Sequence, residues 1–156
     1  MFRGTSSLNL DDKGRLTIPT RYREELQDCC ERKLIISIAV DEACVREQGC
    51  LWLYPLPEWE KLEETIKKLN TLNKAAGYLR RFLVGSASEC DMDAQGRLLL
   101  PEKLRKDAGM DKKVVLVGQL SKFEVWNEED WSAKENAWLD EGASAEDLKE
   151  LGTLSF

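Results

Sequence analysis

Apolar and polar positions form two similar series of short strands along the chain, and each series is interrupted by a helix. The most strongly β-prone runs, at 34–40 and 114–117, predict strands. Pro19 and Pro101 each predict the start of a helix, with Thr20 as the N-cap of the first. The other expected strands are 8–10, 15–18, 51–54, 90–92, 97–100 and 123–126. The pattern therefore predicts a mainly β protein with helices.

Between the two series, apolar residues recur at helical spacing. They stand at 59, 62, 66 and 69 and again at 78, 79, 82 and 83. The stretch 70–74 is expected to break this segment into two helices. Such a stripe is typical of packing, here against the sheet or a neighbouring subunit, rather than of a cofactor site.

The two series are copies of one another. The segment D-D-K-G-R-L-T-I-P at 11–19 recurs 82 positions later as D-A-Q-G-R-L-L-L-P at 93–101. An aromatic block around Trp52 and Trp59 likewise matches one around Trp126 and Trp131. Because both blocks recur in the same order, the chain is predicted to be a tandem duplication. The expected divisions are a first half at 5–58, a helical connector at 59–86, a second half at 87–131 and an acidic tail at 132–156.

Each copy contains a turn whose register can be predicted. A three-residue loop with Gly14 in its third, left-handed position places Asp11 opposite Arg15. The same loop in the second copy, closed by Gly96, places Asp93 opposite Arg97. This register keeps apolar partners on one face of each hairpin. The expected pairs are Leu10 with Leu16, Leu8 with Ile18, and Met92 with Leu98.

Charge and composition narrow the possible functions. The net charge is −6, but residues 128–156 hold nine acidic and two basic side chains, so the first 127 residues are nearly neutral. With no histidine, Ser-His and Cys-His catalysis is excluded. The five cysteines show no C-x-x-C spacing, so neither a disulfide framework nor a zinc site is expected. We expect a cytoplasmic protein that is not an enzyme and has no cofactor, metal, membrane segment or small-molecule substrate.

The predicted turns carry the candidate chemistry. A carboxylate at Asp11 would orient the guanidinium of Arg15 while Lys13 projects from the tip, which suits phosphate oxygens or a guanine edge. Arg97 is the equivalent arginine of the second copy, and Arg3 is a further candidate for phosphate contact just before the first strand. Asp93, Gly14 and Gly96 are expected to shape the two loops. An ordinary surface salt bridge is the alternative interpretation of each pair.

Several motifs resemble the MraZ family of bacterial transcriptional regulators, which has AbrB-like DNA-binding domains. They are M-F-R-G at 1–4, D-x-K-G-R-L-x-I-P-x-R-Y-R at 11–23, L-Y-P-L-P-E-W at 53–59, S-A-S-E-C-D-M-D at 86–93, and G-Q at 118–119 followed by F-E at 123–124 and Trp126. The resemblance extends from residue 1 to about 131.

This resemblance implies two AbrB-like halves that interlock into one swapped-hairpin (double-split) β-barrel. It also implies a homo-oligomeric ring that associates with the nucleoid. The ring would bind direct repeats in promoter DNA as a repressor of the division and cell-wall gene cluster. The family's D-x-x-x-R signature fits Asp11 with Arg15 and Asp93 with Arg97. Because Gln95 replaces Lys13 in the second copy, the first loop is expected to dominate.

Two other functions remain open. Asp91, Asp93, Gln95 and Glu102 fit the spacing of a calcium-binding EF-hand loop. However, an EF-hand needs flanking helices, whereas 97–100 is predicted to be a strand. The second alternative is an interaction or antitoxin-like module that shares the fold without reading DNA.

Overall fold

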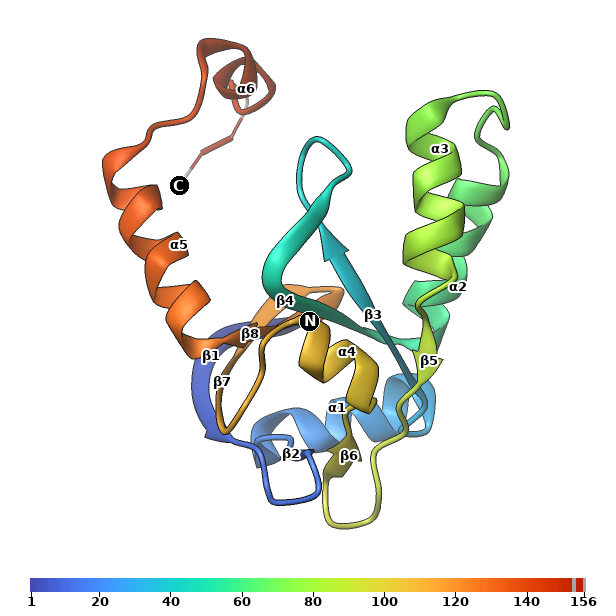
Figure 1. The fold of residues 1–156 in the computed structure, drawn as a ribbon, viewed down its shortest axis with the longest axis vertical. Helices are drawn as coiled ribbons and strands as arrows, with labels where there is room; N and C mark the ends of the chain where they lie inside the picture. The colour runs from blue at the N-terminus through green and yellow to red at the C-terminus, as the bar shows by residue number, and fades with distance from the viewer. Residues whose placement is uncertain (153, 156) are drawn as a thin grey trace.

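A computed structural model describes residues 1–152 and 154–155, which form two antiparallel sheets and the helices around them (Figure 1). The strands are β1 (Phe2–Asn9), β2 (Arg15–Thr17), β3 (Leu34–Val40), β4 (Arg46–Pro55), β5 (Ser88–Glu89), β6 (Arg97–Leu99), β7 (Lys113–Leu120) and β8 (Lys122–Asn127). The helical elements are α1 (Thr20–Cys30), α2 (Leu56–Lys67), α3 (Lys74–Tyr78), the π-helix η1 (Leu79–Val84), α4 (Glu102–Asp107), α5 (Glu128–Asp140) and α6 (Ala145–Glu150). The fold is therefore mixed, mainly strands with helices, as the hydrophobic pattern predicted.

The strands pair across the two copies. The larger sheet has the order β1-β7-β8-β4-β3-β5, and β2 pairs with β6 in a separate ribbon. Leu8 thus lies opposite Val114, and Leu16 lies opposite Leu98. The expected pairs Leu10 with Leu16, Leu8 with Ile18 and Met92 with Leu98 are therefore wrong. Each copy carries the same apolar pattern, so a strand of the other copy provides an equally apolar partner.

The six-stranded sheet is open, because β1 and β5 lie at its opposite edges. Among the described residues the strands do not close into the barrel expected from the resemblance, since closure would require the two edge strands to pair. The two short strands β2 and β6 instead leave the main sheet and carry the two turns at the end of the molecule away from α3 and α6 (Figure 1).

One continuous core holds the two copies together. Ile18 and Leu100, which follow β2 and β6, are 0% and 1% exposed. The ring of Phe123 on β8 is fully buried between those of Phe2 on β1 and Tyr22 on α1, with centroid distances of 4.3 and 5.0 Å. Because each of these contacts joins distant parts of the chain, neither copy has an independent core.

A proline directly precedes the first helical residue of both α1 and α4, the helices that follow β2 and β6. Pro19 and Pro101 are themselves the N-caps of α1 and α4. Thr20 is therefore the first helical residue, and its predicted role as N-cap is wrong. The fixed φ of proline preorganises the entry to the helix, which compensates for the missing side-chain cap.

The connector forms two helical segments separated by a break, as its spacing predicts. Helix α2 ends at Lys67, and α3 begins at Lys74 and continues directly into η1. Trp59, Ile66 and Leu83 are buried in the core, whereas Leu69 and Phe82 are exposed, so a packing role is confirmed for only part of the stripe. The hydroxyl of Ser37 on β3 donates to the Leu83 carbonyl at 2.6 Å and ties η1 to the sheet.

The C-terminal region is more ordered than the expected acidic tail. Helix α5 follows β8 just as α2 follows β4, and Trp131 on α5 packs against Trp126 at 5.5 Å between ring centroids. Ser144 and Asp147 form a capping box that begins α6, within the expected tail. Residues 153 and 156 of the expected tail lie outside the described residues.

Candidate nucleic-acid interface

The first turn closes as a three-residue loop between Asp11 and Arg15. The Asp11 N–H donates to the Arg15 carbonyl and the Gly14 N–H donates to the Asp11 carbonyl, each at 3.0 Å. Asp11 Oδ1 accepts the backbone N–H groups of Lys13 and Arg15, each at 2.9 Å. Gly14 has a φ of +80°, which a residue with a Cβ adopts only under strain. The predicted opposition of Asp11 and Arg15 is confirmed.

The second turn repeats this arrangement. The Asp93 N–H donates to the Arg97 carbonyl at 2.8 Å, and Asp93 Oδ1 accepts the backbone N–H groups of Gln95 and Arg97 at 2.9 Å. Gly96 has a φ of +79°. The two turns therefore present the same backbone, and the predicted opposition of Asp93 and Arg97 is confirmed.

Each carboxylate also fixes the direction of a guanidinium. Arg15 Nε lies 2.6 Å from Asp11 Oδ2, and Arg97 Nε lies 3.1 Å from Asp93 Oδ2. Both arginines remain about one-third exposed, at 31% and 36%. The backbone N–H of Arg15, followed by its guanidinium, holds the pKa of Asp11 below its ordinary value, and Arg97 lowers the pKa of Asp93 in the same way. Both aspartates are therefore ionised at neutral pH, and each contacts its arginine through Nε. Arg97 Nη2 also donates to Gln95 Oε1 at 3.5 Å.

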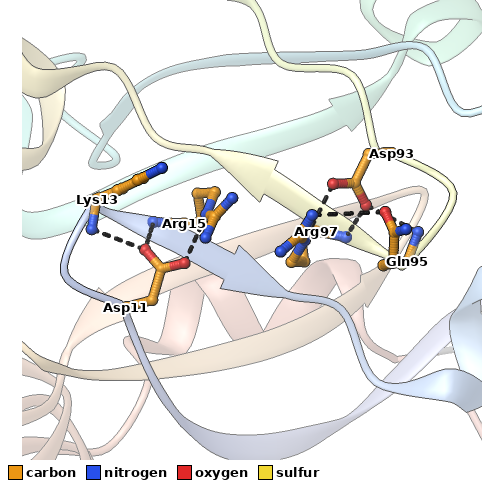
Figure 2. A network of polar contacts seen from close by, with 6 residues as sticks. All are labelled: Asp11, Lys13, Arg15, Asp93, Gln95 and Arg97. Carbon is orange, nitrogen blue, oxygen red and sulfur yellow. Dashed lines mark hydrogen bonds and ion pairs between the residues drawn. The ribbon is translucent and has the colours of Figure 1, made fainter.

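The β2–β6 ribbon brings the two turns together. Figure 2 shows Arg15 and Arg97 near the middle of the ribbon, with Asp11 and Asp93 on either side. The strands are antiparallel, with Arg15 opposite Leu99 and Arg97 opposite Thr17.

Backbone hydrogen bonds extend this pairing into each turn. The Leu100 N–H donates to the Gly14 carbonyl at 3.1 Å, and the Ile18 N–H donates to the Gly96 carbonyl at 2.8 Å. The candidate residues of both copies thus form one continuous surface.

Arg3 does not join this surface. It lies inside β1 rather than before the first strand, and it pairs with Gln119. The first turn follows the other end of β1, and Asn9 lies six positions beyond Arg3, roughly 20 Å away at the usual rise per residue. A DNA contact by Arg3 would therefore require a second region of the protein surface.

Two further arginines approach the turns and were given no role from the sequence. Arg105 on α4 lies against Gly14, and Arg23 on α1 lies against Gly96. The signal that could have found them is the 82-residue repeat itself, because it aligns Arg23 with Arg105 as it aligns Gly14 with Gly96.

The calcium alternative does not fit the geometry of the second turn. Asp93 is engaged by the backbone of its own loop and by Arg97, while Glu102 pairs with Lys106 at 2.7 Å. The segment after the turn is β6 and not a helix. Within residues 1–152 and 154–155, no three histidine, cysteine or acidic side chains cluster in a way that could hold a metal ion.

The cysteines are free thiols with different exposures. Cys30, Cys50 and Cys90 are buried, whereas Cys29 is exposed and Cys44 is half-buried. Burial raises the pKa of Cys90 to about 12, and partial desolvation together with the adjacent Cys30 raises the pKa of Cys29 to about 11. Thiols with such raised pKa values carry little thiolate at neutral pH and are poor nucleophiles.

Over the described part of the chain, no helix is both long enough and apolar enough to cross a membrane.

Comparison with known proteins identifies the family. A family described as "MraZ protein, putative antitoxin-like" matches residues 1–82 and again residues 83–151. The chain belongs to the MraZ family. The sequence-based resemblance is thereby confirmed, and each of the two matched ranges contains one turn of the MraZ fold described above.

Curated MraZ relatives match at high identity. "Transcriptional regulator MraZ" from Methylococcus capsulatus is 49% identical over 160 residues, covering all of both chains. The protein of the same name from Thioalkalivibrio sulfidiphilus is 46% identical over 157 residues, again covering both chains fully. That from Idiomarina loihiensis is 50% identical over 131 residues, or 84% of this chain and 82% of the relative.

Proposed function

We propose that this chain is a sequence-specific DNA-binding transcriptional regulator that acts as a repressor. The observation that carries the proposal is the paired turn surface, in which two oriented arginines project from one antiparallel ribbon. The names of its relatives, each a "Transcriptional regulator MraZ", support this function. The target we propose is the promoter of the division and cell-wall gene cluster.

The paired strands β2 and β6 form a type of element that the major groove can admit. A two-stranded β-ribbon fits into the major groove of B-DNA, and an arginine fork can bond O6 and N7 of a guanine simultaneously. Asp11 and Asp93 hold Arg15 and Arg97 through Nε, which leaves the Nη groups of Arg15 for DNA, whereas Arg97 Nη2 also donates to Gln95 Oε1 at 3.5 Å. The first turn additionally carries Lys13, while the second carries Gln95. We therefore propose that the first turn contributes more to affinity.

The same proposal includes an AbrB-like arrangement of two interlocked halves, 5–58 and 87–131, joined by the connector at 59–86. The exchange of strand partners supports it, since β1 of the first half pairs with β7 of the second and β5 of the second half pairs with β3 of the first. In this arrangement each half contributes one strand and one turn to the β2–β6 ribbon.

We further propose that the protein acts as a homo-oligomeric ring on direct repeats. Each chain presents few cations at its turns, so the counterion-release contribution per chain is small. Several subunits on one DNA would convert later contacts into intramolecular ones. Trp138 and Leu139 on α5, at 76% and 74% exposed, support contacts between subunits because large apolar side chains at such exposure are costly in water.

The test is binding of the purified protein to its own upstream DNA across a salt series. Duplexes with one, two or three repeats separate avidity from single-site binding. A further pair with half a helical turn inserted tests whether repeats must share a face, which requires spacing near about 10 base pairs.

Affinity is expected to rise steeply with repeat number and to fall with the insertion. Equal binding to one repeat and to three would contradict the ring mechanism. Failure to retain any DNA at low salt would instead favour an interaction module that does not read DNA.

A further inference from the structure

An arginine from the opposite copy covers the glycine of each turn. A Cβ built on Gly14 would lie 2.3 Å from Nη1 of Arg105, and one built on Gly96 would lie 2.2 Å from Nε of Arg23. Real carbon and nitrogen atoms do not approach so closely without a bond, so each guanidinium occupies the space that a side chain would need. Both turns therefore require glycine for this contact as well as for their positive φ.

The contacts cross between the copies. Helix α4 belongs to the second copy, yet its Arg105 lies against the turn of the first copy. Helix α1 belongs to the first copy, and its Arg23 lies against the turn of the second. Among the described residues, the atoms nearest to a Cβ on Gly14 or Gly96 belong to no arginine of the same copy. Each turn is thus packed by the helix that follows the other turn.

The two arginines are held differently. Arg23 Nε donates to the carbonyl of Ile18 at 2.8 Å. Arg105 Nε is buried and, among the residues that the structure describes, has no hydrogen-bond partner. The position of Arg105 over Gly14 is consequently maintained by packing, and removal of its side chain leaves no acceptor of Nε unsatisfied. A substitution of Arg105 is therefore easier to interpret than one of Arg23, because it breaks no hydrogen bond of Nε.

We propose that Arg105 and Arg23 are positioning residues that hold the two DNA-contacting turns crosswise. This proposal rests on the proposed DNA-binding function. Arg105 supports the loop that orients Arg15, and Arg23 supports the loop that orients Arg97. A substitution in the second copy is thus expected to damage the dominant turn, which lies in the first copy. The two turns behave as one unit, because each is supported by the copy that carries the other.

An unfolding experiment tests the crosswise packing without DNA. Gly14→Ala and Gly96→Ala are each combined with Arg105→Ala and with Arg23→Ala, and urea midpoints are measured for every variant of the full chain. Arg105→Ala is expected to recover part of the stability lost in Gly14→Ala, because the new methyl group no longer meets the guanidinium. Arg23→Ala is expected to recover no stability in Gly14→Ala. In Gly96→Ala, by contrast, Arg23→Ala is expected to recover part of the lost stability and Arg105→Ala none.

Amide NMR spectra of the single arginine variants provide a second measurement if the glycine variants do not fold. Arg105→Ala is expected to shift the resonance of Gly14, and Arg23→Ala that of Gly96. The crosswise contact would be overturned if an arginine substitution recovered stability, or shifted a glycine resonance, in the turn of its own copy. Additive losses of stability in all four double variants would also overturn it.

A DNA experiment tests the positioning role, with Lys106→Ala as the matched control. Lys106 neighbours Arg105 on α4, is exposed and carries the same charge. Both variants are expected to lose the same small amount of affinity for random-sequence DNA, because each removes one cation. Only Arg105→Ala is expected to lower the ratio of specific to random-sequence affinity, by roughly ten-fold, or about 1.4 kcal/mol. Arg23→Ala is expected to lower it less.

The outcomes are distinguishable. If Arg105→Ala left the ratio of specific to random-sequence affinity unchanged, the positioning role would be overturned. This would hold even if the unfolding data showed that each arginine packs against the turn of the other copy. A larger loss in Arg23→Ala than in Arg105→Ala would contradict the assignment of Arg105 to the dominant turn. If the unsubstituted protein bound no DNA, the proposed function would fail and the positioning role with it. The unfolding data would then still decide whether the packing is crosswise.

Discussion

Replacing Arg15 with alanine separates binding from folding at the proposed interface. In the folded chain its side chain is 31% exposed and makes one ion pair, with Asp11 at 2.6 Å. Exposed pairs of this kind contribute about 0–1 kcal/mol to stability. The backbone hydrogen bonds that close the turn do not depend on the Arg15 side chain, since they involve its N–H and carbonyl. The free energy of unfolding is therefore expected to fall by about 0.5 kcal/mol, the usual scale for surface substitutions.

The loss of DNA affinity is expected to be much larger. An arginine that bonds a base edge is worth roughly 1–3 kcal/mol per site, which corresponds to about a 5- to 150-fold change in affinity. Arg97→Ala is expected to have a smaller effect, because Gln95 leaves the second turn without the cation that Lys13 supplies to the first. Gln95→Lys should accordingly increase affinity and steepen its salt dependence.

The assay is fluorescence anisotropy with a labelled promoter duplex at several salt concentrations, with urea unfolding of each variant in parallel. Lys68→Ala is a suitable control, since Lys68 is an exposed cation that directly follows α2, far along the chain from either turn. The reasoning is refuted if Arg15→Ala keeps the unsubstituted affinity at moderate salt. It is also refuted if the variant unfolds, or if Lys68→Ala loses as much specific affinity as Arg15→Ala.

Three further predictions follow from the geometry. The folded-state pKa values of Asp11 and Asp93 lie below 3.8, so their contribution to turn stability is complete above that pH and is lost as pH falls through the lowered values; a carboxyl NMR titration measures them. Leu16→Ala empties a fully buried position on β2 and should cost about 2–5 kcal/mol by urea unfolding, whereas a loss below 1 kcal/mol would contradict its place in the core. Joint replacement of the exposed Trp138 and Leu139 by alanine should leave the melting temperature nearly unchanged but reduce the mass measured by light scattering, and an unchanged mass would exclude α5 from subunit contacts.

The turns were predictable from sequence because a few adjacent residues determine them. The aspartate that accepts two backbone N–H groups, the glycine with positive φ and the paired arginine all lie within 11–15 or 93–97. Such local hydrogen bonding depends little on the rest of the fold. The strand 34–40 and the break in the connector were predictable for a similar reason, since their patterns are long and strongly periodic.

The strand partners were not predictable, because duplication leaves two equivalent choices. Leu8 and Leu16 each find an apolar partner in either copy, and only the three-dimensional path of the chain selects Val114 and Leu98. Helix α5 was missed because its acidic composition suggested a solvated tail. The alignment of Trp59 with Trp131 was the signal that the second copy also ends in a helix.

Exchange of strands between the copies has a consequence for synthesis of the protein. Asn9 on β1 pairs with Lys113 on β7, which lies 104 positions later in the chain (113 minus 9). At about 5–20 residues per second on the ribosome, β1 waits roughly 5–20 seconds for its partner. The β2–β6 ribbon likewise awaits the second copy. A nascent chain thus lacks the paired turns until the second copy is made, and an incomplete product released early would lack the proposed DNA-binding surface.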